Sequence, residues 1–144
     1  MEKLYAVAYV SSAVRMLDDA ELEALLMDAR AFNLTQRVTG VLLHHDGTFF
    51  QYFEGPVDGI DAVYAKVRAS TRHRGIVELM RQEVKNREFS NWSMGFSAVS
   101  TNLMLELERA RWSKLARQLQ THPGHSDGLS LLLQFWRGAL REKA

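Results

Sequence analysis

The sequence predicts an α+β fold, in which a ferredoxin-like sheet carries two helices on one face and a helical hairpin follows it. Up to residue 99, segments with apolar residues at every second position alternate with segments of helical periodicity, in the order βαββαββ. Asp46-Gly47 separates two of the strand segments by a tight turn, so these strands should pair antiparallel. From residue 100 on, the apolar residues recur with helical spacing around one break, HPGH.

Residues 3–12 alternate and predict the first strand, and residues 18–33 predict the first helix. The acidic residues at the start of the helix suit the positive end of its dipole. One face of the strand carries Tyr5, Val7, Tyr9 and Ser11. The apolar stripe of the helix contains Leu22, Leu25, Leu26 and Ala29. Asn33 follows Ala29 by four residues, so an amide closes this stripe.

Residues 38–45 and 48–55 (TFFQYFEG) predict a hairpin with a glutamine among aromatic residues. Alternation places Phe49, Gln51 and Phe53 on one face, and Phe50, Tyr52 and Glu54 on the other. A buried amide without a hydrogen-bond partner costs about 1–3 kcal/mol. Gln51 should therefore have a specific partner.

Pro56 is typical of a helix start and precedes the second predicted helix. The apolar stripe of this helix is Ile60, Val63, Tyr64 and Val67. Residues 75–86 and 91–99 predict two further strands. The C-terminal hairpin should dock on the uncovered sheet face. Its second helix has Leu131 and Phe135 outside the main apolar stripe, which indicates either a dimer or partner surface or a fully packed helix.

The composition excludes several classes of function. The 144 residues suit one domain with a small appendage, and 47% hydrophobic residues can form a core. A net charge of +1 favours neither nucleic acid nor a membrane surface as partner. No apolar run reaches transmembrane length, so a cytoplasmic protein is expected. Without cysteine there is no disulfide, no cysteine zinc site and no thiol nucleophile, and the paired histidines are expected at the surface rather than on a metal.

Tyr9, Asn33 and Gln51 are polar residues at positions where the periodicity predicts inward side chains. Each has an ordinary explanation, since a buried tyrosine often bonds a backbone carbonyl and a helix-end asparagine is often a cap. Together they could line a ligand with flat polar edges, because amides supply both donors and acceptors. This predicts a heteroaromatic ligand.

The ordered motifs resemble the BLUF domain, a blue-light sensor that uses a flavin, in its short stand-alone form. The matching stretches are YVS (9–11), NLTQRVTGVLLHHDGTFFQYFEG (33–55), RH (72–73) and FSNWSMGF (89–96). The resemblance runs from about residue 3 to residue 99. It implies a flavin-binding photosensor domain over residues 1–99 and a C-terminal helical extension over residues 100–144.

The resemblance implies a non-covalently bound flavin, FAD or alternatively FMN. The photoactive and switch residues would be Tyr9, Gln51, Trp92 and Met94. The cofactor-binding residues would be Asn33, Gln51, Arg30, Phe49, Lys66, Arg72 and His73. The chain departs from the family at Ser70, where many members have an acid, and at Ala29, where many have a small polar residue.

The implied mechanism is proton-coupled electron transfer between Tyr9 and the excited flavin, which rearranges the hydrogen bonds of Gln51. The chain would not be an enzyme and would signal to a separate, unidentified protein, with a homo-oligomer through the C-terminal helices or sheet as an option. Two other functions stay open. A small ferredoxin-like acyl-phosphate hydrolase would use Arg15, which has no glycine-rich loop around it. A ligand-free interaction domain is the other alternative.

Overall fold

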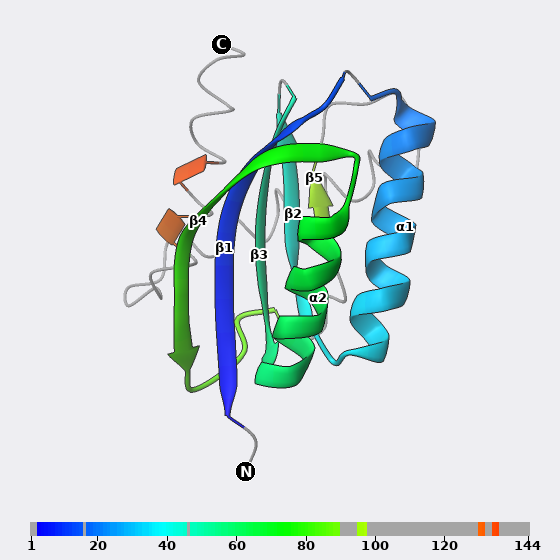
Figure 1. Ribbon diagram of the computed structural model, residues 1–144. Coiled ribbons are helices and arrows are strands. Elements are labelled where there is room, and N and C mark those ends of the chain that lie inside the picture. Colours follow the sequence, from blue (N-terminus) through cyan, green and yellow to red (C-terminus); the bar gives the residue numbers. More distant parts are fainter. Residues whose placement is uncertain are drawn as a thin grey trace.

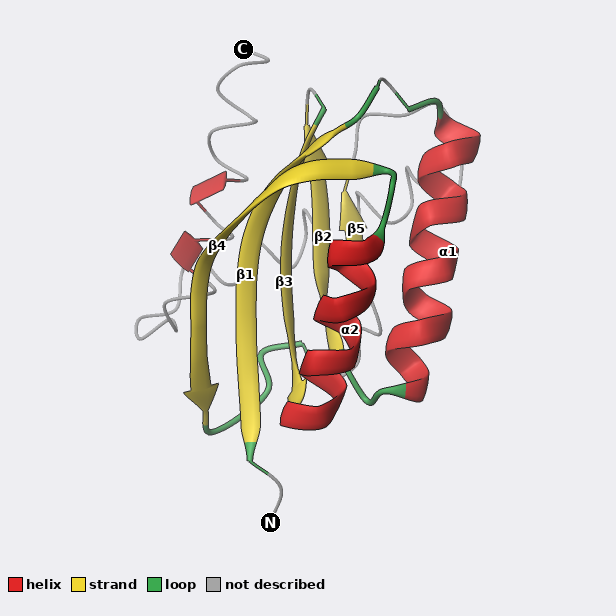
Figure 2. Ribbon diagram, viewed as in Figure 1, coloured by secondary structure: helices red, strands yellow, loops and turns green. Residues whose placement is uncertain are grey.

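A five-stranded sheet with two helices on one face forms the body of the protein (Figures 1 and 2). This computed structural model describes residues 3–15, 17–45, 47–89, 95–97, 130–131 and 134–135. The strands are β1 (Leu4–Ala13), β2 (Thr39–His45), β3 (Thr48–Pro56), β4 (His73–Val84) and β5 (Gly95–Ser97). Their order in the sheet is β4-β1-β3-β2-β5, and the first four strands pair antiparallel. The predicted ferredoxin-like arrangement is confirmed.

Strand β5 differs from the other four strands, because it lies parallel to its neighbour β2. Its partners on β2 are Val41 for Gly95 and Leu43 for Ser97. The reason lies in the strand order. Strand β2 runs opposite to β4, so a chain that reverses after β4 and crosses to the other edge of the sheet must run with β2. Of the predicted strand 91–99, residues 95–97 are described.

The two helices are α1 (Asp19–Thr35) and α2 (Val57–Ala69). A capping box fixes the start of α1, since the Asp18 side chain accepts a hydrogen bond from the Glu21 N–H at 2.8 Å and the Glu21 carboxylate accepts one from the Asp18 N–H. Helix α2 passes very close to the end of α1, where a Cβ at Gly59 would lie 2.2 Å from the Gln36 carbonyl oxygen. Within the described residues, no helix combines the length and apolar character that a membrane span needs.

The sheet separates two hydrophobic cores, as the alternation along β3 predicts. The core between sheet and helices contains Val7, Tyr9, Leu22, Leu26, Val38, Leu42, Phe49, Phe53, Ile60, Val63 and Tyr64. The core on the opposite face contains Ala6, Ala8, Val41, Leu43, Phe50, Tyr52 and Phe89. Strand β3 contributes large aromatic residues to both cores, so it is buried on both faces.

Two of the described C-terminal residues, Leu131 and Phe135, pack on the sheet face that α1 and α2 leave open. Leu131 and Phe135 contact the second core, and the ring centroids of Phe135 and Phe50 are 5.3 Å apart. These two contacts lie on the sheet face where the hairpin was expected to dock. The rest of the predicted hairpin, within residues 100–144, lies outside the described residues.

Hydrogen bonds of two kinds hold residues 85–89, which follow β4, against the sheet: the sheet accepts one from the backbone of this segment and others from its Arg87 side chain. The Glu54 carboxylate is fully buried and accepts hydrogen bonds from the Tyr52 hydroxyl at 2.9 Å and from the Phe89 N–H at 2.6 Å. The Arg87 guanidinium donates in return to the carbonyl oxygens of Arg37 and Glu54, at 2.7 and 3.2 Å. Burial raises the pKa of the Glu54 carboxyl above its ordinary value, partly offset by hydrogen bonds from the backbone N–H groups of Glu88 and Phe89 and from the Tyr52 hydroxyl.

Candidate ligand-binding site

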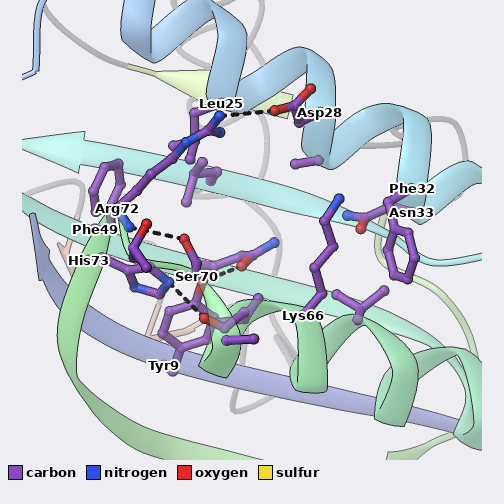
Figure 3. A pocket seen from close by; sticks show the side chains of 17 residues that line it. Tyr9, Leu25, Asp28, Phe32, Asn33, Phe49, Lys66, Ser70, Arg72 and His73 are labelled. Atoms are coloured by element: carbon purple, nitrogen blue, oxygen red, sulfur yellow. Dashed lines mark hydrogen bonds and ion pairs between the residues drawn. The ribbon is translucent and has the colours of Figure 1, made fainter.

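A cavity of about 420 Å³ lies between α1, α2 and the first core face of the sheet (Figure 3). Its walls come from β1, β2, β3, both helices and the turn between α2 and β4. Apolar walls are provided by Leu25, Phe49 and Val63, and polar groups stand among them. This size and lining are typical of a site for a small organic ligand.

Tyr9 and Gln51 form a hydrogen bond inside this cavity. They are direct neighbours across β1 and β3, and the Tyr9 hydroxyl donates to Gln51 Oε1 at 2.5 Å. Both side chains are buried, and the Tyr9 ring stacks on Tyr64 with centroids 6.0 Å apart. Burial, and to a lesser extent Tyr64, holds the pKa of the Tyr9 phenol far above its ordinary value. The phenol therefore remains protonated and acts as the donor of this bond.

Asn33 presents an unsatisfied donor to the cavity. Its backbone carbonyl accepts hydrogen bonds from the N–H groups of Gln36 and Val38, both at 3.0 Å, which hold the residue at the end of α1. Its side chain is buried and lines the cavity, but Nδ2 has no hydrogen-bond partner. An unpaired buried amide costs about 1–3 kcal/mol. A ligand with an acceptor atom at this position would remove that cost.

Three charged side chains reach the cavity from the two helices and the turn before β4. The Lys66 ammonium lies 4.5 Å from the centroid of the Phe32 ring. Arg72 Nη2 lies 3.1 Å from Asp28 Oδ2, which links the turn before β4 to α1 (Figure 3). The cavity therefore contains cationic donors beside its neutral amides.

His73 closes the cavity next to Tyr9 through two hydrogen bonds. Nε2 lies 3.0 Å from the Val67 carbonyl oxygen, and Nδ1 lies 2.7 Å from the buried Ser11 hydroxyl. A carbonyl can only accept, so Nε2 carries the proton and Nδ1 of the neutral ring accepts from Ser11. Burial lowers the pKa of His73, partly offset by the Val67 carbonyl, and this favours the neutral ring.

The structure brings together most of the residues that the sequence singled out. The following predicted residues line the cavity: Tyr9, Asn33, Phe49, Gln51, Lys66, Arg72 and His73. Arg30 is not among the lining residues, whereas Ala29 and Ser70, the two departures from the family pattern, are. Trp92 and Met94 lie outside the described residues.

Asp28 and Phe32 line the cavity but were missed by the sequence analysis. Phe32 follows Leu25 by seven residues and Ala29 by three, so helical spacing beside the apolar stripe was a usable signal. Asp28 lies next to the apolar stripe of α1, where an acidic residue ordinarily faces solvent. No local pattern connects it to Arg72, which is 44 residues away.

The lining residues fit a flat heteroaromatic ligand with polar edges. Asn33 Nδ2 offers a buried donor, Gln51 offers an amide and the walls are apolar. A sequence profile described as "Sensors of blue-light using FAD" (BLUF) matches residues 4–95 of the chain. The chain belongs to the BLUF family. It is thus a member of a family of flavin-using blue-light sensors, and its sheet and two helices are the BLUF fold.

The curated relatives are much longer proteins than this chain. Photoactivated adenylate cyclase subunit beta of Euglena gracilis is 32% identical over 92 residues, which are 63% of this chain and 11% of that protein. The chain therefore spans about a tenth of the length of the curated relatives it matches.

Solved BLUF structures match over more of the chain. The dark-state structure of BlrB, a BLUF protein, is 30% identical, with a TM-score of 0.62 over 78% of this chain and 87% of that one. A structure titled BlrP1 BLUF is 27% identical, with a TM-score of 0.68 over 92% and 88%. Klebsiella pneumoniae BlrP1 with FMN and cyclic diGMP is 29% identical, with a TM-score of 0.60 over 73% and 29%.

Proposed function

We propose that this chain is a blue-light photoreceptor in which Tyr9 and Gln51 are the photoactive pair beside a non-covalently bound flavin. The observation that carries this proposal is the 2.5 Å hydrogen bond between their side chains, buried in a cavity that also holds an unpaired amide. A phenol that stays protonated can give up its proton only together with a change in its electronic state.

The cofactor would be FAD, with FMN as the alternative. Asn33 would donate from Nδ2 to an acceptor on the ring edge, and Phe49 would form an apolar wall. The cations Lys66 and Arg72 would bind the phosphate part, and the neutral His73 would hold Ser11 and Val67 in place behind the ring. Arg30, which does not line the cavity, would contact a phosphate outside it.

A bound flavin would supply the absorption of blue light and an electron acceptor in its excited state. Tyr9 would supply the electron from its phenol, and the proton would leave along the hydrogen bond to Gln51. The Gln51 amide carries an acceptor on one side and two donors on the other, so a rearrangement of this amide exchanges what it presents to its neighbours. The altered hydrogen bonding of Gln51 would be the signal.

The output would pass through residues 100–144 to a separate protein, with residues 1–99 as the photosensor domain. Trp92 and Met94 would transmit the change of Gln51 toward this extension, and a homo-oligomer through the C-terminal helices or the sheet is a second route. Relatives named photoactivated adenylate cyclase subunits carry a BLUF-like segment within a much longer chain. We infer that the present chain, located in the cytoplasm, acts without catalysis of its own and reaches its effector by binding it.

The acyl-phosphate hydrolase alternative receives no support from Arg15. Its guanidinium forms an ion pair with Glu21, the residue that also completes the capping box of α1. In a ligand-free interaction domain, Asn33 Nδ2 would remain buried without a hydrogen-bond partner, and no ligand would offset this free-energy cost.

The test is the absorption spectrum of the purified protein in the dark and after blue light. A flavin spectrum with a reversible red shift is expected, and Tyr9→Phe should keep the flavin but lose the shift, because it removes only the hydroxyl. A colourless protein that takes up no added flavin would contradict the proposed function. An unchanged photoproduct yield in Tyr9→Phe would contradict the role of Tyr9 alone.

A further inference from the structure

Asp28 and Arg72 form an ion pair where the cavity meets solvent. Arg72 Nη2 and Asp28 Oδ2 are 3.1 Å apart, and the two side chains are 44% and 60% exposed. Both residues also line the cavity, so the pair joins α1 to the turn before β4 across its opening (Figure 3). A bound ligand that extends out of the cavity on this side must pass beside the Asp28–Arg72 pair or break it.

The ion pair engages Arg72, which is one of the two cations that a phosphate could contact in the cavity. Among the described residues that line the cavity, Lys66 and Arg72 are the cations and Asp28 is the carboxylate. His73 does not add a third charge, because its two ring nitrogens serve Val67 and Ser11 and its pKa is lowered by burial. The lining residues thus carry a net charge of +1. One of the two positive charges, that of Arg72, is already paired with the Asp28 carboxylate.

The guanidinium of Arg72 suits either partner equally well in geometry. Its planar fork of N–H donors matches the two oxygens of a carboxylate and those of a phosphate. A carboxylate on the protein is always present at high effective concentration, whereas the phosphate arrives with the ligand. Binding of a phosphorylated ligand at Arg72 therefore includes the loss of the contact with Asp28.

We propose that Asp28 competes with the phosphate of a bound flavin for Arg72, and so sets how strongly the cavity prefers phosphorylated flavins over riboflavin. The inference rests on the proposed function, because it takes a flavin as the ligand. The competition is modest, since exposed ion pairs stabilise proteins weakly and the pair opens readily. Asp28 is thus a specificity-determining residue that weakens FMN and FAD binding without acting on the ring.

The test measures the affinities of the full-length apoprotein for riboflavin, FMN and FAD by quenching of flavin fluorescence. Asp28→Asn is expected to tighten FMN and FAD binding by about fivefold and to leave riboflavin unchanged. Adding Arg72→Gln should abolish this gain, because the competing cation is then absent. Asp61→Asn is the matched control, since it breaks a comparable Asp–Arg pair, with Arg81, on α2 outside the cavity.

Two results would overturn the inference and can be told apart. If Asp28→Asn changes the affinity for all three flavins by the same factor, or weakens them all, Asp28 acts on the ring or on the fold, while the proposed function stands. If the wild-type apoprotein binds none of the three flavins, the proposed function fails and the inference fails with it. A gain for FMN and FAD that persists after Arg72→Gln also contradicts the inference, because the competition must pass through Arg72.

Discussion

At the scale of single residues, Gln51 combines burial with a hydrogen bond to Tyr9 and a place on the cavity wall. Gln51→Leu should retain bound flavin, because the apolar walls and Asn33 are unchanged, but should lose the light-induced red shift. Dark and light absorption spectra at equal flavin occupancy measure this. Gln82→Leu, a matched change on β4 outside the cavity, should keep the shift. Wild-type spectra for Gln51→Leu would assign Gln51 a packing role only.

Asn33 shows the cost of keeping a binding group ready. Its Nδ2 has no partner in the protein, so Asn33→Ala loses no hydrogen bond from that atom in the ligand-free state. The variant should bind flavin about tenfold more weakly, while its apoprotein unfolds at an unchanged or higher temperature. Flavin titration and thermal unfolding of the apoprotein measure the two effects. A destabilised apoprotein with normal flavin affinity would identify Asn33 as a purely structural residue.

The site was predictable from sequence where local periodicity decides the direction of a side chain. Alternation placed Tyr9 and Gln51 on the inner face, and the spacing from Ala29 placed Asn33 there too, as the structure confirms. Asp28 was not predictable, because its role depends on the approach of Arg72 from a distant turn. Glu54 was placed on the correct face, yet its complete burial depends on the backbone of the segment after β4, which no local pattern reveals.

At the scale of elements, the Glu54 carboxyl and the Arg87 guanidinium form hydrogen bonds that hold residues 85–89, which follow β4, against the sheet. The raised pKa of Glu54 means that the folded state binds this proton more tightly than the unfolded chain does. Unfolding free energy contributed by this group should therefore fall as the pH rises from about 4.5 through the raised pKa. Deprotonation leaves a buried charge that its donors only partly offset.

Glu54→Gln should remove this part of the pH dependence. The neutral amide keeps an acceptor for the Phe89 N–H, so the fold should be retained. The difference in unfolding free energy between the variant and the wild type, from denaturant titrations between pH 4.5 and 8, should grow in favour of the variant as the pH rises. His73 has the opposite slope near its ordinary pKa of 6.5, but it is present in both proteins and cancels in the difference. Parallel stability curves would show that Glu54 titrates alike in both states.

The fold was predictable to the order of the elements along the chain and the pairing of β2 with β3, and the parallel β5 marks the limit. Short turns and alternation predict β2 and β3 as an antiparallel pair, because the partner is the next segment in the chain. The partner of β5 lies across the whole sheet, on the edge opposite to β4. The partner of β5 depends on which edge of the sheet remains unpaired after the other strands have assembled. The sequence of β5 and its neighbouring residues does not contain this information.

At the scale of the whole molecule, one sheet serves two cores, and the ligand cavity lies on one side only. Replacing Leu131 and Phe135 together by alanine should lower the unfolding free energy by about 3 kcal/mol, because both side chains are partly buried against the second core. Flavin affinity and the red shift should remain, since neither residue reaches the cavity. Thermal unfolding and flavin titration measure this, with Leu34→Ala at a 71% exposed position of α1 as the control. Loss of flavin binding would show that the two faces are coupled.

The interior position of β1 in the sheet has a consequence for the synthesis of the protein on the ribosome. Strand β1 is made first, yet it pairs with β3 on one side and with β4 on the other. Its second edge stays open until residues 73–84 have left the exit tunnel, and the last walls of the cavity, Arg72 and His73, arrive only then. The nascent chain therefore cannot complete the walls of the cavity before the start of β4 has emerged. A full cavity for a light-absorbing cofactor thus forms late in synthesis, however early the first hairpin forms.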